Sequence, residues 1–337
     1  MKRASWSSSG TLSIVAAVLA ALPVSGSAAP ITYQSAVTAD SPYAYYRFNE
    51  SPVSSGTAMT DTGSGGHTGT YFSGAGGSAT GGVTGYGVSS DNAVSFPGTG
   101  TGATGAYAGA ANTGSATDIK PFGSLVGASS LEFIIKVNAG FSTSTQQSVF
   151  GVFSTASLGN YSDMEVTLNS AGNDALGAKP NQTRLYIKGS DGDGVGVDFT
   201  NASLYDGNFH LVTFTFDQTL SGVNAFHAYL DGAAQTLNFA SVATNAQDAD
   251  TDPDGFVNFS ADPTFAGRNV RGALGSTAVG RLANITIDEA SLYGKILSAD
   301  DVATHAAAAG VPEPASAALL GLGACGLLAS RRRKTSR

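Results

Sequence analysis

The sequence has little cysteine and little positive charge. Its one cysteine, Cys325, lies near the C-terminus, so the rest of the chain forms no disulfide and depends on a hydrophobic core for its stability. Residues 30–311 hold 10 basic and 24 acidic residues, a net charge of −14. This region lacks the clustered Lys and Arg that bind phosphates, which excludes a nucleic-acid-binding protein and favours the attraction of cations.

Tryptophan and the common catalytic motifs are missing as well. Trp6 is the one tryptophan and lies at the N-terminus, so a sugar site in the remainder would use tyrosine as its aromatic platform. The available tyrosines are Tyr43, Tyr45, Tyr46, Tyr107, Tyr161, Tyr186, Tyr205 and Tyr229. No His-Glu-x-x-His or Gly-x-Ser-x-Gly pattern occurs. We therefore expect no enzyme.

The N-terminus has the features of a secretory signal peptide. Lys2 and Arg3 precede an apolar stretch at residues 12–24, and small residues follow at 25–29. A basic start, a short apolar segment and a small-residue cleavage site are typical of such peptides, and the apolar stretch is shorter than a membrane span needs. We expect residues 1–29 to be removed on export, with an uncleaved anchor as the alternative.

The C-terminus combines three features. Pro312, Glu313 and Pro314 come first, an apolar segment follows at residues 315–330, and five basic residues complete the chain. A basic cluster holds the end of a membrane-inserted segment on the cytoplasmic side. Together with the N-terminal signal, this order resembles the PEP-CTERM sorting signal, here residues 312–337. The resemblance implies a transient membrane anchor, exosortase-type machinery as partner, Pro312, Glu313 and Pro314 as its recognition residues, and delivery to the cell surface, envelope or extracellular matrix.

Residues 30–311 read as many short strands separated by Gly-, Ser- and Asp-rich turns. The expected strands lie at residues 43–48, 93–96, 131–137, 148–153, 164–168, 184–188, 195–199, 209–216, 225–230 and 282–293, and residues 51–82 and 97–118 are expected as loops. Asp231-Gly232 predicts a hairpin turn. Such a pattern favours an all-β sandwich.

One helix is expected near residue 300. Ser298 and Asp301 have the spacing of a capping box, Asp300 suits the positive helix N-terminus, and Gly310 can end the helix. The strands and this helix predict a two-sheet fold with a short C-terminal helix.

Several segments, in this order, resemble the LamG-like family, which has the concanavalin A-like jelly-roll fold. They are Tyr45-Tyr46-Arg47-Phe48-Asn49-Glu50, Asp61-Thr62-Gly63 with His67-Thr68-Gly69, Ala93-Val94-Ser95-Phe96, Asp206-Gly207-Asn208-Phe209-His210, Tyr229-Leu230-Asp231-Gly232 and Ile287-Asp288-Glu289. Phe209 stands where the family usually has Trp. The resemblance spans residues 41–307 and implies a fold and a binding or display role, without naming a ligand.

Acidic loops offer candidate calcium sites. Asp250, Asp252 and Asp254 alternate before Gly255, and Asn258 follows at the ninth position, as in the first part of a calcium loop. Ala261 occupies the twelfth position, where such loops carry a bidentate Glu, so a solvated acidic loop is the alternative. Weaker candidates are Asp191 with Asp193, and Asp288 with Glu289.

Four histidines and one carboxylate pair complete the candidates. His210 and His227 are expected as partly buried structural residues in strands, His67 in a loop and His305 in the helix. Asp163 and Glu165 occupy alternate positions on a strand, so their side chains lie on one face. Glycosidases use two carboxylates, and this pair is therefore a candidate for that chemistry. The expected function is a non-enzymatic binding or display protein for glycan or protein, with calcium as its one candidate cofactor. The alternatives are a polysaccharide hydrolase or lyase and a structural matrix component.

Overall fold

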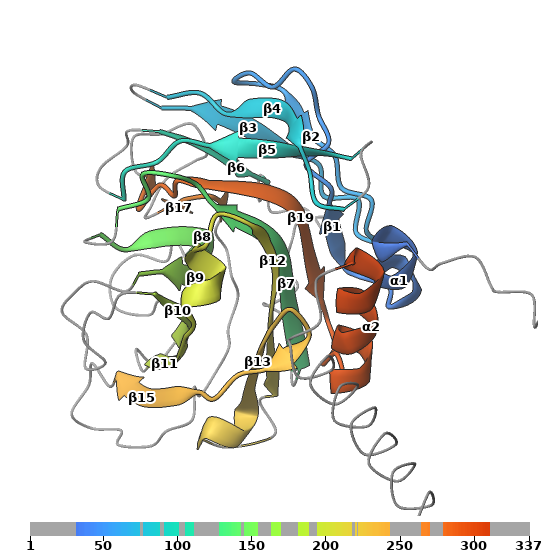
Figure 1. Cartoon of the computed structure of the whole chain (residues 1–337), viewed down its shortest axis with the longest axis vertical. Helices are drawn as coiled ribbons and strands as arrows, with labels where there is room; N and C mark the ends of the chain where they lie inside the picture. The colour runs from blue at the N-terminus through green and yellow to red at the C-terminus, as the bar shows by residue number, and fades with distance from the viewer. Residues whose placement is uncertain are drawn as a thin grey trace, which may run out of the picture. The chain divides into compact units, whose positions relative to one another are not determined.

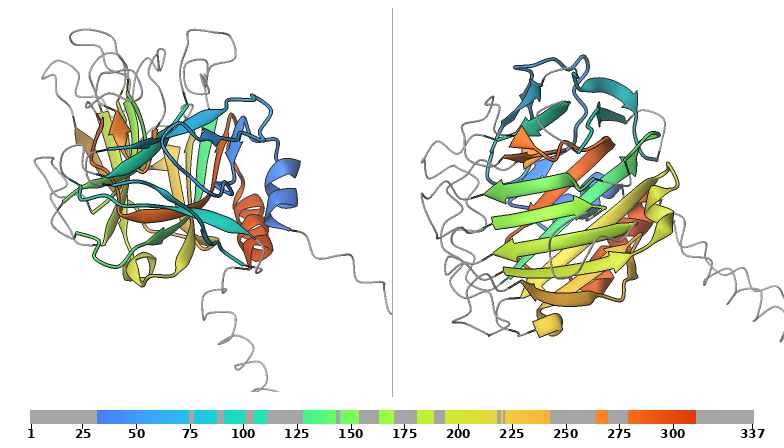
Figure 2. Two further views of the ribbon diagram at one scale, coloured as in Figure 1. Left: turned by 90° about the horizontal axis from the view of Figure 1, so that it is seen from above. Right: turned by 90° about the vertical axis from the view of Figure 1, so that its left-hand side faces the viewer.

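The computed structural model describes residues 32–74, 77–87, 91–100, 105–110, 128–142, 145–153, 163–169, 181–188, 194–217, 220, 222–242, 264–269 and 279–310. These residues form two large antiparallel sheets packed face to face, with two helices on one outer face (Figures 1 and 2). The expected two-sheet jelly-roll sandwich with a C-terminal helix is confirmed.

The first sheet, called sheet A, lies beneath the helices. Its strands run in the order β14 (Ala233–Ala234), β13 (Phe226–Leu230), β12 (Phe209–Asp217), β7 (Ala128–Val137), β19 (Ile285–Tyr293), β5 (Asn92–Phe96) and β4 (Thr80–Thr84), while β1 (Ala44–Tyr46) also pairs with β19. The last long strand therefore lies between segments from the beginning and the middle of the chain.

The second sheet, called sheet B, forms the opposite layer (Figure 2). Its order is β15 (Asn238–Val242), β11 (Gly194–Thr200), β10 (Gln182–Lys188), β9 (Asp163–Leu168), β8 (Gln147–Phe153), β16 (Thr264–Phe265), β6 (Ala106–Gly109), β3 (Gly69–Ser73) and β2 (Ala58–Met59). A small ribbon pairs β17 (Arg268–Asn269) with β18 (Val279–Gly280), and the 3-10 helices are η1 (Ala202–Tyr205) and η2 (Gly222–Ala225).

The main core lies between the sheets and follows the two-residue period of the strands. On β12, Val212, Phe214 and Phe216 enter this core, whereas Leu211 packs on the other face beneath the helices. Both faces of this strand are therefore buried. Each large apolar side chain so buried stabilises the fold by about 1.5–3 kcal/mol relative to exposure.

The predicted hairpin turn and the predicted ends of the C-terminal helix are confirmed. Asp231 and Gly232 both have positive φ, 54° and 78°, and they connect β13 to β14 as a two-residue hairpin loop. At the helix α2 (Ala299–Ala309), the capping box of Ser298 and Asp301 is present and Gly310 is left-handed.

Two expected loops contain strands. The region 51–82 includes β2, β3 and the beginning of β4, and the region 97–118 includes β6. These strands have two to five residues each, too few to show the apolar alternation by which a strand is recognised in a sequence. Backbone pairing with neighbours defines them instead, as between β3 and β6.

A second helix, α1 (Tyr33–Ala39), was not expected from the sequence. It is only seven residues long and begins at the N-cap Thr32, whose side chain accepts a hydrogen bond from the Ser35 N–H. A helix this short is not stable on its own. It is stabilised by docking, because Tyr33 and Val37 pack with residues of α2 and sheet A beside it (Figure 1).

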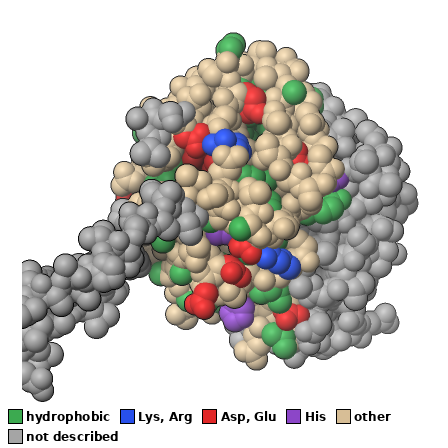
Figure 3. Space-filling model, turned by 90° about the vertical axis from the view of Figure 1, so that its right-hand side faces the viewer, with side chains coloured by type: hydrophobic (Ala, Val, Ile, Leu, Met, Phe, Trp, Pro, Cys, Tyr) green, Lys and Arg blue, Asp and Glu red, His purple; other side chains and the backbone are tan. Residues whose placement is uncertain are grey.

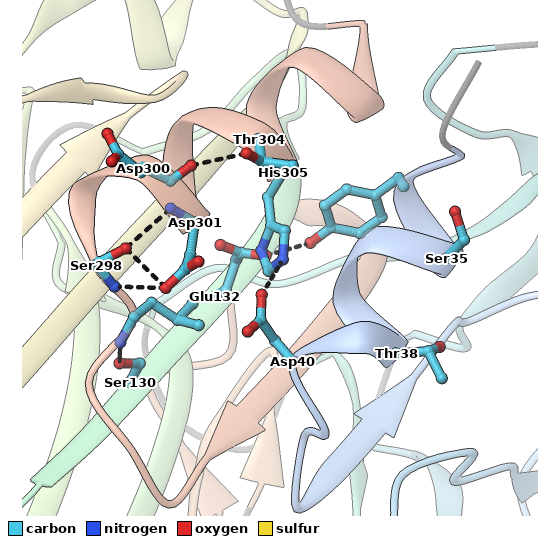
Figure 4. A network of polar contacts seen from close by, with 12 residues as sticks. Ser35, Thr38, Asp40, Ser130, Glu132, Ser298, Asp300, Asp301, Thr304 and His305 are labelled. Atoms are coloured by element: carbon cyan, nitrogen blue, oxygen red, sulfur yellow. Dashed lines mark hydrogen bonds and ion pairs between the residues drawn. The ribbon is translucent and has the colours of Figure 1, made fainter. Parts of the chain in front are cut away.

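A buried polar network ties both helices to sheet A (Figure 4). We call Tyr33, Asp40, Glu132 and His305 the helix-docking cluster. Glu132 on β7 accepts hydrogen bonds from the Tyr33 hydroxyl at 2.7 Å and the Thr213 hydroxyl at 2.9 Å, and lies 2.9 Å from His305 Nδ1. The other ring nitrogen of His305 lies 3.0 Å from Asp40.

Two carboxylates therefore flank the buried ring of His305. Burial alone would lower the pKa of His305, but the hydrogen bond and charge of Glu132, together with Asp40, raise the pKa above its ordinary value. A protonated imidazole donates from both nitrogens, and this matches its two acceptors.

Candidate functional site

Most of the strongest sequence candidates lie outside the described residues. These are the sorting residues Pro312, Glu313 and Pro314, the loop residues Asp250, Asp252, Asp254 and Asn258, and the pair Asp191 and Asp193. Asp288 and Glu289, the weaker candidate, lie within the described residues and take part in a well-defined cluster.

A β-bulge sets the direction of these two acidic side chains. The pairing of β19 with β7 shifts register between Ile287 and Glu289. In a regular strand, consecutive side chains point to opposite faces, whereas a bulge re-aims one of them. Neither Asp288 nor Glu289 belongs to the inter-sheet core, although each is only 2% exposed.

A third carboxylate and one guanidinium complete the cluster. One carboxylate oxygen from each of Asp91, Asp288 and Glu289 lies within 4.8 Å of the others. Arg47, next to β1, places Nη2 3.1 Å from both oxygens of Asp91 and Nε 3.4 Å from Glu289 Oε1. We call these four residues the acidic pocket. Within the described part of the chain, these three carboxylates share a single cation.

One buried carboxylate oxygen of the acidic pocket, Asp288 Oδ1, has no hydrogen-bond partner. At Glu289, a side-chain hydrogen bond with Tyr45 acts to lower the pKa. Burial and the charge of Asp91 raise the pKa of Asp288 to about 8. Burial and the charge of Asp288 raise the pKa of Glu289 well above its ordinary value. A proton or a hard cation would relieve this excess of negative charge.

The acidic pocket also touches the turn that follows β4. A Cβ atom placed on Gly85 would lie 2.3 Å from Asp288 Oδ1, so the close approach of backbone and carboxylate requires glycine. A hydrogen bond from the backbone of Tyr86 lowers the pKa of Asp288, opposing the effect of burial. The protonation state of Asp288 is thus coupled to the position of the Tyr86 backbone.

Tyr86 forms part of a cavity of about 910 Å³ on the other side of that turn. Its ring lies edge-on to Phe209, with centroids 6.0 Å apart. Lys136 Nζ lies 4.9 Å from the centre of the Phe209 ring. Burial and the charge of Asp231 raise the pKa of Tyr86 to about 12.

His210 and two aspartates form part of the polar lining of this cavity. The Nδ1 atom of His210 lies 2.7 Å from Asp231 Oδ2 and its Nε2 lies 3.2 Å from Asp206 Oδ1. Burial alone would lower the pKa of His210, but hydrogen bonds and charges of Asp231 and Asp206 raise it. For Asp206, burial acts to raise the pKa, and hydrogen bonds from Asn208 and His210 outweigh it and lower the pKa.

A second cavity, of about 620 Å³, adjoins the first. Both are lined by Lys136, Asp206 and Gly207. The second has its own aromatic pair, in which Phe141 and Tyr205 lie edge-on with centroids 5.8 Å apart. Tyr205 is one of the tyrosines available from the sequence, and its hydroxyl donates to the Gln182 carbonyl at 2.9 Å.

The remaining histidines are distributed differently from the prediction. His210 is buried, as expected, but His227 is exposed on β13, because that strand lies near the edge of sheet A. His67 is buried in its loop beside Tyr43. His305 belongs to the helix-docking cluster.

Glu165, half of the carboxylate pair considered for glycoside hydrolysis, is held in an ion pair on β9. Its Oε2 lies 2.7 Å from Arg281 Nη1, and Ser148 donates a hydrogen bond to its Oε1. Glu165 itself is only 2% exposed.

Sequence reasoning missed Asp91, Arg47 and the two cavities. Arg47 and Glu289 are 242 residues apart in sequence, yet both belong to the quoted LamG-like segments, which is the one signal that could have paired them. Acidic side chains beside few basic ones are visible on the face that carries α1 and α2 (Figure 3).

Within the described part of the chain, no helix is long and apolar enough to cross a membrane. The apolar segment at residues 315–330 lies outside that part.

Comparison with known proteins identifies the C-terminal signal and the fold. Residues 310–334 match the PEP-CTERM protein-sorting motif. The fold is similar to the binding domain of botulinum neurotoxin DC in complex with SialylT, at 13% identity and a TM-score of 0.50, over 80% of this chain and 52% of that one. The same domain in complex with rat synaptotagmin II gives 12% identity and a TM-score of 0.49, with equal coverage.

The chain spans about half the length of these structural relatives. No curated protein matches it in sequence. The protein is therefore an exported protein with a PEP-CTERM sorting signal, which implies transient membrane anchoring before exosortase processing, and with a β-sandwich fold shared with binding domains.

Proposed function

We propose that this protein is a non-enzymatic binding module that is delivered to the cell surface or extracellular matrix and recognises a glycan or a protein there. The observation that carries the proposal is the order of its parts. The sorting motif begins at Gly310, the C-cap of α2, so the sandwich directly precedes the delivery signal. Delivery and ligand binding are thus assigned to adjoining parts of one chain.

The polar chemistry of sheet B supports a binding role over catalysis. A retaining or inverting glycosidase needs one carboxylic acid and one free carboxylate on either side of the sugar bond. Glu165 is buried and engaged by Arg281 and Ser148, which suits a structural ion pair.

We further propose that calcium binds the acidic pocket. Calcium takes six to eight oxygen ligands, often carboxylates. Asp91, Asp288 and Glu289 supply three carboxylates, and one buried oxygen among them, Asp288 Oδ1, is unpaired. These residues fit the ion at least as well as the loop of Asp250, Asp252, Asp254 and Asn258, which lacks a bidentate Glu.

The test of delivery and binding uses the producing bacterium. Replacement of Pro312, Glu313 and Pro314 by alanine is expected to leave the protein in the membrane fraction, while the native chain reaches the surface or matrix. The full chain should also bind exopolysaccharide or surface protein isolated from that bacterium. Unchanged delivery of the variant would contradict the sorting role, and absence of binding to either material would contradict the binding role.

A further inference from the structure

We infer that the two adjoining cavities form one groove for a neutral, linear oligosaccharide. This inference rests on the proposed binding function and names its ligand class and its site. The first cavity lies over the outer side of sheet A, between the turn after β4 and the start of β12. The second continues from the end of β7 to Asn181 before β10, where Phe141 and Tyr205 pack against the inter-sheet core.

The size of the groove favours a ligand longer than one sugar. The cavities measure about 910 and 620 Å³, and ligand pockets typically measure about 300–1,000 Å³. Because Lys136, Asp206 and Gly207 line both, one extended ligand can pass from the first cavity into the second.

Each cavity provides an aromatic surface. Tyr86 and Phe209 belong to the first, and Phe141 and Tyr205 to the second. All four rings are half-buried rather than part of the closed core. Half-buried aromatic rings leave part of their apolar surface open to the C–H groups of sugars, so two such pairs offer two successive contacts along a chain of sugar rings.

Asp206 is placed to orient the ligand. Its side chain is 42% exposed, and Asn208 fixes it with a backbone hydrogen bond of 2.7 Å and a side-chain bond of 2.9 Å. A carboxylate has about four acceptor positions. The remaining capacity of Asp206 faces the passage between the cavities, where sugar hydroxyls can donate to it.

The groove carries charge of both signs. Asp206 and Asp231 lie with Lys136 and with His210, whose pKa the two carboxylates raise. A charged sugar would therefore meet repulsion as well as attraction. A neutral ligand rich in hydroxyl groups can donate to the carboxylates and accept from Lys136.

Gly207 permits a direct test of the passage. Its φ is +85°, and a Cβ atom placed there would meet no atom within 4 Å. Asparagine tolerates positive φ better than most residues. Gly207→Asn should therefore retain the fold while placing a side chain between the two cavities.

The experiment measures binding of neutral tetrasaccharides to the full chain in mild detergent by isothermal titration calorimetry. The probes have gluco, manno, galacto and xylo configuration, each with its monosaccharide, and tetragalacturonate is the anionic comparison. We expect one neutral tetrasaccharide to bind at least about tenfold more tightly than its monosaccharide. Asp206→Asn and Gly207→Asn should each weaken binding about tenfold or more, since they remove a charged acceptor or block the passage.

Asp300→Asn serves as the matched control, because Asp300 is exposed on α2 away from both cavities, and it should bind like the native chain. A melting curve of each variant verifies that it is folded. Binding of no neutral tetrasaccharide, tighter binding of tetragalacturonate, or equal binding by Asp206→Asn would overturn the inference. If the native chain then still bound exopolysaccharide or surface protein, the proposed binding function would stand without this groove.

Discussion

Two groups of buried carboxylates on sheet A differ in how completely they are satisfied. In the helix-docking cluster, Glu132 Oε1 is bound by Tyr33 and His305, and Oε2 by Thr213. In the acidic pocket, Asp288 Oδ1 is unpaired although the residue is buried. Since buried polar atoms are nearly always hydrogen-bonded, the first group has the character of a structural joint, and the second is incomplete and suits the calcium site that we propose.

The supply of positive charge separates the two groups in the same way. His305 lies between two carboxylates, and Lys295 adds a second cation at Asp40. Among the residues that the structure describes, Arg47 is the one cation paired with the carboxylates of the acidic pocket. The two groups therefore differ in the number of partners available to each carboxylate, and not in the burial of their acidic residues.

The largest expected effect is a difference in stability between variants of Glu132 and of Glu289. Glu132→Gln leaves one side-chain oxygen for three donors and removes the charge beside His305, so we expect a loss of about 3–5 kcal/mol of unfolding free energy. Glu289→Gln removes repulsion and is expected to change stability little without calcium. Urea unfolding of both variants with a chelator present measures this. A greater loss of unfolding free energy in Glu289→Gln than in Glu132→Gln would show that the acidic pocket, and not the helix-docking cluster, is the structural joint.

Calcium should act on only one of the two groups. A ligand at 100 times its dissociation constant stabilises a protein by about 2.7 kcal/mol, which raises Tm by about 5–10 °C in a domain of this size class. Asp288→Asn should abolish the rise. Glu132→Gln should retain it from a lower starting Tm. Thermal melting with calcium or a chelator measures the effect.

Asp252→Ala distinguishes the acidic pocket from the loop of residues 250–258. We expect this variant to respond to calcium like the native chain. A response that is lost in Asp252→Ala but retained in Asp288→Asn would move the ion to the loop.

The pH dependence of stability offers a smaller but specific difference. The folded-state pKa of Asp288, about 8, lies above its unfolded value of about 3.9, so its contribution is complete below pH 3.9 and is lost as the pH rises through 8. We expect Tm in chelator to fall between pH 5 and 8, and to fall less in Asp288→Asn. His305 and His210 also have raised pKa values and add a decline in the same direction at higher pH.

Saturating calcium should flatten this decline, because a bound cation favours the ionised carboxylate. An equal slope in native and Asp288→Asn proteins would show that Asp288 does not take up a proton on folding.

The sequence predicted the parts of the fold that local patterns encode. The residues of β12 carry a clear apolar alternation, and the cap residues Ser298 and Gly310 define α2. The strands β3 and β6 and the helix α1 escaped prediction because pairing and docking stabilise them, not their own composition. Local patterns cannot reveal an element whose stability comes from distant neighbours.

The same reason limits prediction of the sites. Asp288 and Glu289 are adjacent and were recognisable as a candidate, but their common pocket depends on a bulge that leaves no mark in the sequence. Asp91 joins them through the pairing of β5 with β19. The quoted segments Asp206–His210 and Tyr229–Gly232 line part of the first cavity, but no motif joined them to the residues of β7 that line both cavities.

The smallest expected effect on stability concerns Lys295, an exposed residue beside the helix-docking cluster. Lys295 forms an ion pair with Asp40, but its side chain is 45% exposed, and exposed pairs contribute about 0–1 kcal/mol. Lys295→Met should therefore lower the unfolding free energy by less than about 1 kcal/mol, and the loss should shrink as salt is added. His305, fully buried between Glu132 and Asp40, would still hold α1 against α2. A loss as large as that of Glu132→Gln would mean that the exposed lysine, and not the buried imidazole, supplies the charge that balances this cluster.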